Sequence, residues 1–95
     1  MTDEYQATAA VATEAAARYA KQLVSHLGRR LEVREEDRGT RLVFPSGSCL
    51  LVVSDVGLEL IAGAADAASL ENVKDVVARH LERFGQRNEL TVHWN

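Results

Sequence analysis

The stretch TRLVFPSGSCLLVVSDVGLELIA, residues 40–62, decides the fold of this chain. It contains three runs rich in Leu, Val, Ile and Phe, at residues 40–44, 49–54 and 58–62, and such residues favour β-strands. Residues 45–48 and 55–57 separate the runs and hold the Pro, Ser, Asp and Gly typical of turns. Because these gaps are too short for a crossover, the three strands are predicted to pair antiparallel.

Three further runs flank this stretch. Residues 31–35 form a fourth predicted strand, which Arg38 and Gly39 separate from the next one. Residues 90–94 alternate three apolar residues with Thr and His, which is typical of a half-buried closing strand. Residues 6–11 are a weaker candidate because alanine has a low β propensity, so the sequence leaves this strand open.

Two segments, residues 14–27 and 67–84, are predicted to be amphipathic helices. Thr13 and Asp66 are the expected N-caps, and Gly28 and Gly85 the expected stops. The apolar stripes are Ala16, Tyr19, Ala20, Leu23, Val24 and Leu27 in the first helix and Leu70, Val73, Val77, Leu81 and Phe84 in the second.

The expected fold is a single α+β domain over residues 1–95: an antiparallel β-sheet of five or six strands with two antiparallel helices packed on one face. The opposite face of the sheet carries Val43, Ile61 and one of the two apolar sets of residues 49–53. It is therefore less polar than a solvated face usually is. This strip is either a few scattered surface aliphatics or a surface for a partner or a second copy of the chain.

Composition and charge exclude several classes of protein. Eleven Lys and Arg against fourteen Asp and Glu give a formal charge of −3, the wrong sign for a nucleic-acid binder. The longest strongly apolar run, residues 49–53, is too short to span a membrane, and no Lys or Arg precedes Arg18 as a secretory signal requires. Cys49 is the only cysteine, which excludes an intramolecular disulfide and indicates a buried structural thiol. A cytoplasmic location is expected.

No phosphate loop, dinucleotide fingerprint, nucleophile elbow or zinc signature occurs in the sequence. The remaining candidates for a functional site are His26 and His80, each at the edge of the apolar stripe of its helix. If both of these edges face the groove between the helices, Gln22 and Arg83 would line the groove with them. Both histidines are near C-terminal ends of helices expected to point in opposite directions, which separates them by roughly 15 Å. A shared metal is therefore not expected, and neither a cofactor nor a catalytic residue is predicted. Each histidine is either a structural ring bonded to backbone or a ligand for a carboxylate or similar anion.

Three blocks of the sequence form a recognisable set. They are Arg18, Tyr19, Lys21, Gln22, Leu23, Ser25 and His26; Phe44, Pro45 and Gly47; and residues 79–84 followed by Glu89, Leu90, Val92 and Trp94. Over nearly the whole chain this set resembles the small bacterial family named domain of unknown function 2218 (DUF2218). The resemblance supplies no activity, but it implies stand-alone cytosolic domains, with some relatives fused to siderophore-interacting flavin reductases and hence a link to ferric-siderophore handling. The positions that it marks for testing are Lys21, His26, His80 and Arg83.

The favoured function is a non-enzymatic binding or accessory module for a small anionic ligand or metal chelate. The residues expected to bind it are Lys21, Gln22, His26, His80 and Arg83. One alternative is a protein–protein interaction subunit that forms a homodimer through the open sheet face. Another is a small enzyme that uses a histidine as general base, which would need a carboxylate or thiol to orient the ring.

Overall fold

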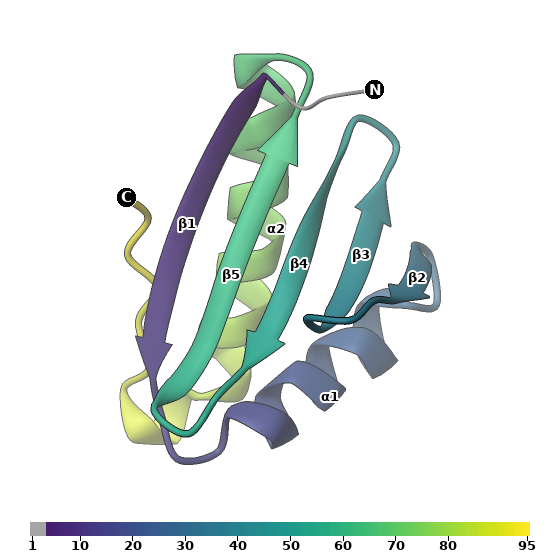
Figure 1. Cartoon of the computed structure of the whole chain (residues 1–95). Coiled ribbons are helices and arrows are strands. Elements are labelled where there is room, and N and C mark those ends of the chain that lie inside the picture. The colour runs from purple at the N-terminus through teal and green to yellow at the C-terminus, as the bar shows by residue number, and fades with distance from the viewer. Residues whose placement is uncertain (1–3) are drawn as a thin grey trace.

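The computed structural model describes residues 4–95 (Figure 1). Its elements, in chain order, are β1 (Tyr5–Ala12), α1 (Ala16–Leu27), β2 (Glu32–Glu35), β3 (Thr40–Phe44), β4 (Gly47–Val53), β5 (Gly57–Ala64), α2 (Ala67–Phe84) and a 3₁₀ turn, η1 (Gln86–Asn88). The α+β fold is confirmed, with five antiparallel strands and two helices. Residues 6–11, for which the sequence left a strand open, lie in β1.

The strands form one antiparallel sheet in the order β1-β5-β4-β3-β2. The N-terminal strand β1 lies at one edge and pairs along its whole length with β5, with Ala9 opposite Leu60. Ala7 and Ala9 are buried, and α2 contacts this strand. Their burial and the ladder to β5 therefore outweigh the low β propensity of alanine.

Both helices pack against the same face of the sheet. Tyr19 and Leu23 of α1 belong to one continuous core with Val77 and Leu81 of α2 and with Leu60 of β5, and each of these side chains is almost completely buried. The face that carries Val43 and Ile61 is therefore the open one, as predicted, and neither residue belongs to this core. Within residues 4–95, neither helix has both the length and the apolar character needed to cross a bilayer.

The ends of the helices follow the sequence signals with one exception. Asp66 caps α2 by accepting a hydrogen bond from the Ser69 N–H at 2.7 Å, and α2 ends at Gly85 as predicted. Thr13 is not the N-cap of α1, because its Oγ1 accepts from the N–H of Ala15 in the preceding turn and the helix begins two residues later than expected.

The prediction of a closing strand at residues 90–94 is wrong. Glu89 takes a left-handed conformation with φ of 54°, and the chain then runs beside β1 without forming a ladder (Figure 1). The N–H of Val92 donates to the Glu82 carboxylate at 2.9 Å, and the N–H of Asn95 donates to the Thr8 carbonyl at 2.8 Å. The apolar side chains still pack on the core, because burial does not require sheet pairing. These side chains are Leu90, Val92 and Trp94.

The two helices are offset along their axes. β1 ends and α2 finishes at the same end of the sheet, so α1 starts there and runs obliquely beneath β4 towards β2 (Figure 1). It contacts the C-terminal part of α2. The side-chain amide of Asn88, just after α2, donates to the Tyr19 hydroxyl near the start of α1 at 2.9 Å. This offset decides which residues of the two helices meet.

Candidate functional site

His26 and His80 lie side by side. Their ring centroids are 5.0 Å apart with an angle of 45° between the planes, and Phe84 packs near both rings at 5.8 and 6.4 Å. The predicted separation of roughly 15 Å is wrong, since it assumed that the helices lie level with each other. The 12-residue α1 instead faces the C-terminal half of the 18-residue α2, which brings its last turn level with His80.

The orientation of His80 is fixed by its own helix. Its Nδ1 lies 2.7 Å from the carbonyl oxygen of Val76. Because a carbonyl only accepts hydrogen bonds, Nδ1 carries the proton and donates it. In the neutral ring, Nε2 then has a free lone pair. His80 is half-buried, whereas His26 is exposed.

Both histidines line a hollow of about 480 Å³ at the C-terminal end of α1. Two arginines of the following turn, Arg29 and Arg30, contribute cationic groups to the same hollow. The apolar part of its lining comes from Leu27, Leu31, Phe44 and Val76. Among residues 4–95, no carboxylate lines it and neither arginine forms an ion pair.

A second hollow of about 450 Å³ lies on the other side of His80. Arg83 lines it together with Arg79, Glu82 and Gln86. Arg79 is paired with Asp75 at 3.0 Å, so it is less available to a ligand. Of the described residues, His80 alone lines both hollows.

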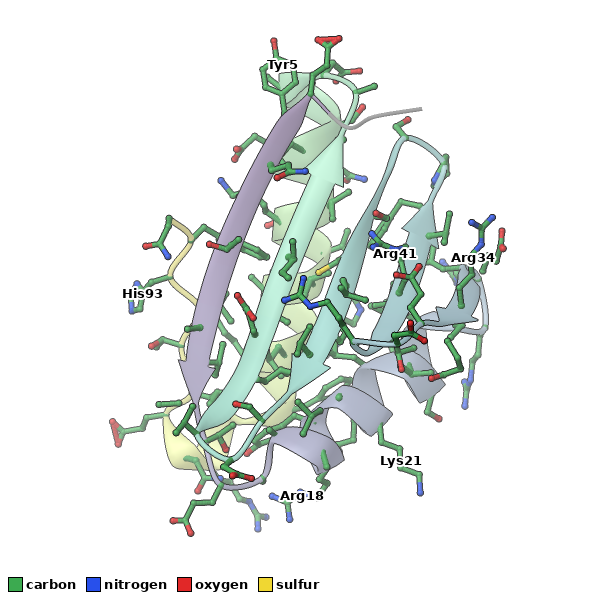
Figure 2. All side chains as sticks on the ribbon, in the orientation of Figure 1. Tyr5, Arg18, Lys21, Arg34, Arg41 and His93 are labelled. Atoms are coloured by element: carbon green, nitrogen blue, oxygen red, sulfur yellow. The ribbon has the colours of Figure 1, made fainter. Side chains whose placement is uncertain are left out.

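The five predicted site residues do not form one cluster. His26 and His80 meet, and Arg83 lies in the adjacent hollow. Lys21 and Gln22 are exposed and line neither hollow, and Lys21 points away from the sheet (Figure 2). A place beside the apolar stripe of its helix is therefore not enough to predict that a residue lines the groove between the two helices.

The sequence analysis did not predict Arg29 and Arg30 as site residues, because two charged residues after a helix usually lie in solvent. The turn decides their place: the N–H groups of Arg30 and Leu31 both donate to the Leu27 carbonyl, at 3.1 and 3.0 Å. The chain thus stays close to the end of α1 before entering β2. Two arginines directly after the Gly28 stop were the signal in the sequence.

The open sheet face is partly apolar, as expected. One cross-strand row places Thr8, Ile61, Leu50, Arg41 and Arg34 side by side. Leu50 is only 4% exposed, although no helix covers this face. Arg41 lies next to it on the face toward the viewer in Figure 2.

Charged pairs interrupt this face. The Arg41 guanidinium donates to the Glu36 carboxylate at 2.7 and 3.1 Å and to the Ser48 hydroxyl at 2.9 Å. The bond from Arg41 holds the pKa of Glu36 below its ordinary value. Arg38 and Glu59 lie 3.9 Å apart. The apolar strip is therefore narrower than the strand pattern suggests.

Cys49 is a core residue, as predicted. It is fully buried, and burial raises the pKa of its thiol to about 12. A thiol with such a pKa is almost entirely protonated at neutral pH and is a poor nucleophile. Across the part of the chain that the structure describes, no group of three or more His, Cys, Asp and Glu is arranged to hold a metal ion.

Comparison with known proteins places the chain among bacterial relatives. The model of a family described as "Uncharacterized protein conserved in bacteria (DUF2218)" matches residues 8–95. An NMR structure of PA4090 from Pseudomonas aeruginosa is similar with a TM-score of 0.78 and 31% identity, covering 96% of this chain and 95% of that one. No curated protein matches the sequence. The match over nearly all of the chain shows that this protein belongs to the DUF2218 family.

Proposed function

We propose that this protein is a non-enzymatic binding module for a small organic anion, held in the hollow between the C-terminal end of α1 and α2. The observation that carries the proposal is the composition of this hollow. Among residues 4–95, those that line it are two arginines, two histidines and an apolar wall, and none of them is a carboxylate. Such a lining attracts negative charge and repels cations.

The arginines are suited to the charged end of such a ligand. A guanidinium donates two parallel hydrogen bonds to a carboxylate or a similar planar anion. Arg29 and Arg30 are exposed, and no acidic side chain of residues 4–95 competes for them through an ion pair. A bound anion would therefore not have to displace a partner.

The apolar wall selects the rest of the ligand. Leu31, Phe44 and Val76 line the hollow together with the cationic groups, and the ring of His26 lies beside that of Phe84. Small-molecule sites typically combine such apolar surfaces with a few polar groups. An aromatic carboxylate fits this chemistry better than a small hydrophilic anion does. An anionic ferric chelate is a larger member of the same class, and the family resemblance supports testing it.

A histidine-dependent enzyme is less well supported. A general base needs a partner that orients the ring, commonly a carboxylate. His80 is oriented by the Val76 carbonyl, and within residues 4–95 no carboxylate bonds to either ring of the pair. The one thiol, Cys49, is buried in the core.

Homodimer formation through the open sheet face is a second alternative. Its support is the row of Ile61 and Leu50, which no helix covers. Against it, the Arg41 and Arg38 pairs lie across the same face, and separating or burying them would cost desolvation energy. The anion site is therefore the better-supported function.

The experiment is an NMR titration of the ¹⁵N-labelled protein with benzoate in the presence of EDTA. We expect shift changes confined to residues 26–31, Phe44 and residues 76–80. The double variant Arg29→Gln, Arg30→Gln should weaken binding by at least about tenfold, because charge-assisted hydrogen bonds are lost. The control variant Lys21→Gln removes a cation of α1 that lies outside the hollow and should leave the affinity unchanged.

Two additional ligands complete the design. Benzyl alcohol keeps the ring without the charge, and acetate keeps the charge without the ring, so both should bind more weakly than benzoate. Benzoate shifts that spread over the whole surface, or that persist unchanged in the double arginine variant, would contradict the proposal.

A further inference from the structure

We infer that His80 is a direct ligand of the bound anion and that it takes up one proton from solvent when the anion binds. The inference rests on the proposed anion site and adds the control of that site by pH. It stands on the fixed orientation of the His80 ring, on the place of this ring in the hollow and on the charges around it. Its consequence is that the affinity for the anion falls as pH rises through the range in which histidine titrates.

The ring of His80 presents one nitrogen to a ligand. Its Nδ1 donates to the carbonyl oxygen of Val76 at 2.7 Å, within the same helix. This bond directs the Nδ1 side of the ring to the helix backbone, while the side chain lines the hollow. Nε2 is therefore the nitrogen left for a ligand.

The proton on this nitrogen decides whether it can bind an anion. In the neutral ring with Nδ1 protonated, Nε2 carries only a lone pair and accepts hydrogen bonds. A carboxylate also only accepts, so the neutral ring offers it no bond. In the protonated ring both nitrogens donate, Nδ1 to the Val76 carbonyl and Nε2 to the anion, and the second bond is charge-assisted. Anion binding therefore favours the protonated form of His80.

The surroundings of His80 do not supply the negative charge that such a proton needs. Among residues 4–95, the charged groups that line the two hollows beside the ring come from α2 and from the turn after α1. They are Arg79, Glu82, Arg83, Arg29 and Arg30. Arg79 is paired with Asp75, and Glu82 already accepts the N–H of Val92. β3 contributes the uncharged Phe44 to the lining. The compensating negative charge therefore has to come from the ligand.

His26 is the nearest titratable group. The two ring centroids are 5.0 Å apart, so two protonated rings would repel each other. His80 is half-buried and oriented by Val76, whereas His26 is exposed. A bond from the anion to the half-buried ring competes less with water than a bond to the exposed one. The proton is therefore assigned to His80, with His26 neutral in the complex.

The test is the benzoate titration of the full chain, repeated between pH 6.0 and 8.5, a range in which benzoate stays ionised. We expect the dissociation constant to rise at least about fivefold from pH 6.0 to 8.0, and by no more than about tenfold per pH unit, the limit for uptake of one proton. Calorimetry at pH 7.0 in buffers of different ionisation enthalpy should show net proton uptake on binding. Long-range ¹H–¹⁵N correlations should show both nitrogens of His80 protonated in the complex.

Three variants locate the proton. His80→Gln keeps a polar side chain that does not titrate, and should reduce the change from pH 6.0 to 8.0 to less than about twofold. His26→Gln should retain the pH dependence of the parent protein. His93→Gln is the matched control, because this exposed histidine lies on the C-terminal segment beside β1 (Figure 2). It should leave both the affinity and its pH dependence unchanged.

The outcomes separate this inference from the anion site itself. Binding with the same dissociation constant at every pH would overturn the inference and leave the anion site intact, whereas no binding at any pH would contradict both. A pH dependence that persists in His80→Gln would overturn the assignment to His80. The backbone spectrum checks that this variant folds. If it does not fold, the ring spectra of the parent protein decide, and benzoate that leaves Nε2 of His80 unprotonated would overturn the inference.

Discussion

The side-chain amide of Asn88 donates a hydrogen bond of 2.9 Å to the hydroxyl of Tyr19, which joins the turn after α2 to the first half of α1. Tyr19 is only 2% exposed, so its ring is held in the core while its hydroxyl reaches this turn. The bond joins the start of α1 to the turn after α2, in keeping with the packing of α1 beside the C-terminal part of α2. The same packing places His26 beside His80.

The first prediction concerns this bond. Tyr19→Phe and Asn88→Ala should each lower the free energy of unfolding by about 0.5–1.5 kcal/mol, the usual net contribution of one hydrogen bond. The double variant should lose less than the sum of the two, because either single change already removes the bond. Urea unfolding measures all four proteins. If the loss in the double variant equalled the sum of the two single losses, the bond would contribute nothing to the free energy of unfolding.

The second prediction concerns the C-terminal segment. Glu82→Ala removes the acceptor for the N–H of Val92 and should loosen residues 90–95 from the core. Trp94, the only tryptophan, packs on that core and reports the change as a red shift of its fluorescence. Glu82→Gln keeps an oxygen acceptor and serves as the control, so it should shift the emission much less. Equal spectra for Glu82→Ala and the parent protein would contradict this account.

The third prediction concerns Cys49. The ordinary pKa of its thiol is 9.0, whereas burial raises the pKa in the folded protein to about 12. A raised folded-state pKa adds stability below the unfolded pKa, and this stability is lost as pH rises towards the folded one. The stability difference between the parent protein and Cys49→Ala should therefore shrink between pH 9 and 12, by at most about 1.4 kcal/mol per pH unit.

The same burial makes the native thiol unreactive. Iodoacetamide at pH 8 should modify Cys49 only in unfolded molecules, so the rate should rise with urea in parallel with the unfolded fraction. Rapid modification of the native protein would show that the thiol is accessible.

The fourth prediction concerns the cap of α2. The N–H of Ser69 donates to the Asp66 carboxylate and lowers the pKa of Asp66 below its ordinary value. A lowered folded-state pKa adds stability above the unfolded pKa, and this stability is lost as pH falls through the folded one. Asp66→Asn keeps an acceptor without the charge. Its melting temperature should lie below that of the parent at pH 7, and the gap should close on acidification towards pH 2.

The control for this cap is Asp37→Asn, an exposed acid in the turn between β2 and β3. It should leave the melting temperature nearly unchanged at both pH values. If the difference in melting temperature between Asp66→Asn and the parent did not change with pH, the charge of Asp66 would contribute nothing and the cap would act through its hydrogen bond alone.

Much of the fold could be predicted because its signals are local. Helical spacing located both helices, and Asp66, Gly28 and Gly85 marked three of their ends. The short turns of residues 40–62 required antiparallel pairing of three strands. The strand predicted at residues 90–94 failed because its alternation signals burial of Leu90, Val92 and Trp94, which the core provides without a ladder. Alternation by itself does not distinguish these two cases.

The sequence by itself determined the composition of the site: two histidines near helix ends and several nearby cations without a recognisable motif. Only the tertiary structure decided that His26 meets His80, that Arg29 and Arg30 join them and that Lys21 does not. The reason is that periodicity fixes the direction of a side chain around its own helix but not the displacement of one helix along another. That displacement comes from the packing of two helices of unequal length on one sheet and from contacts such as that of Asn88 with Tyr19.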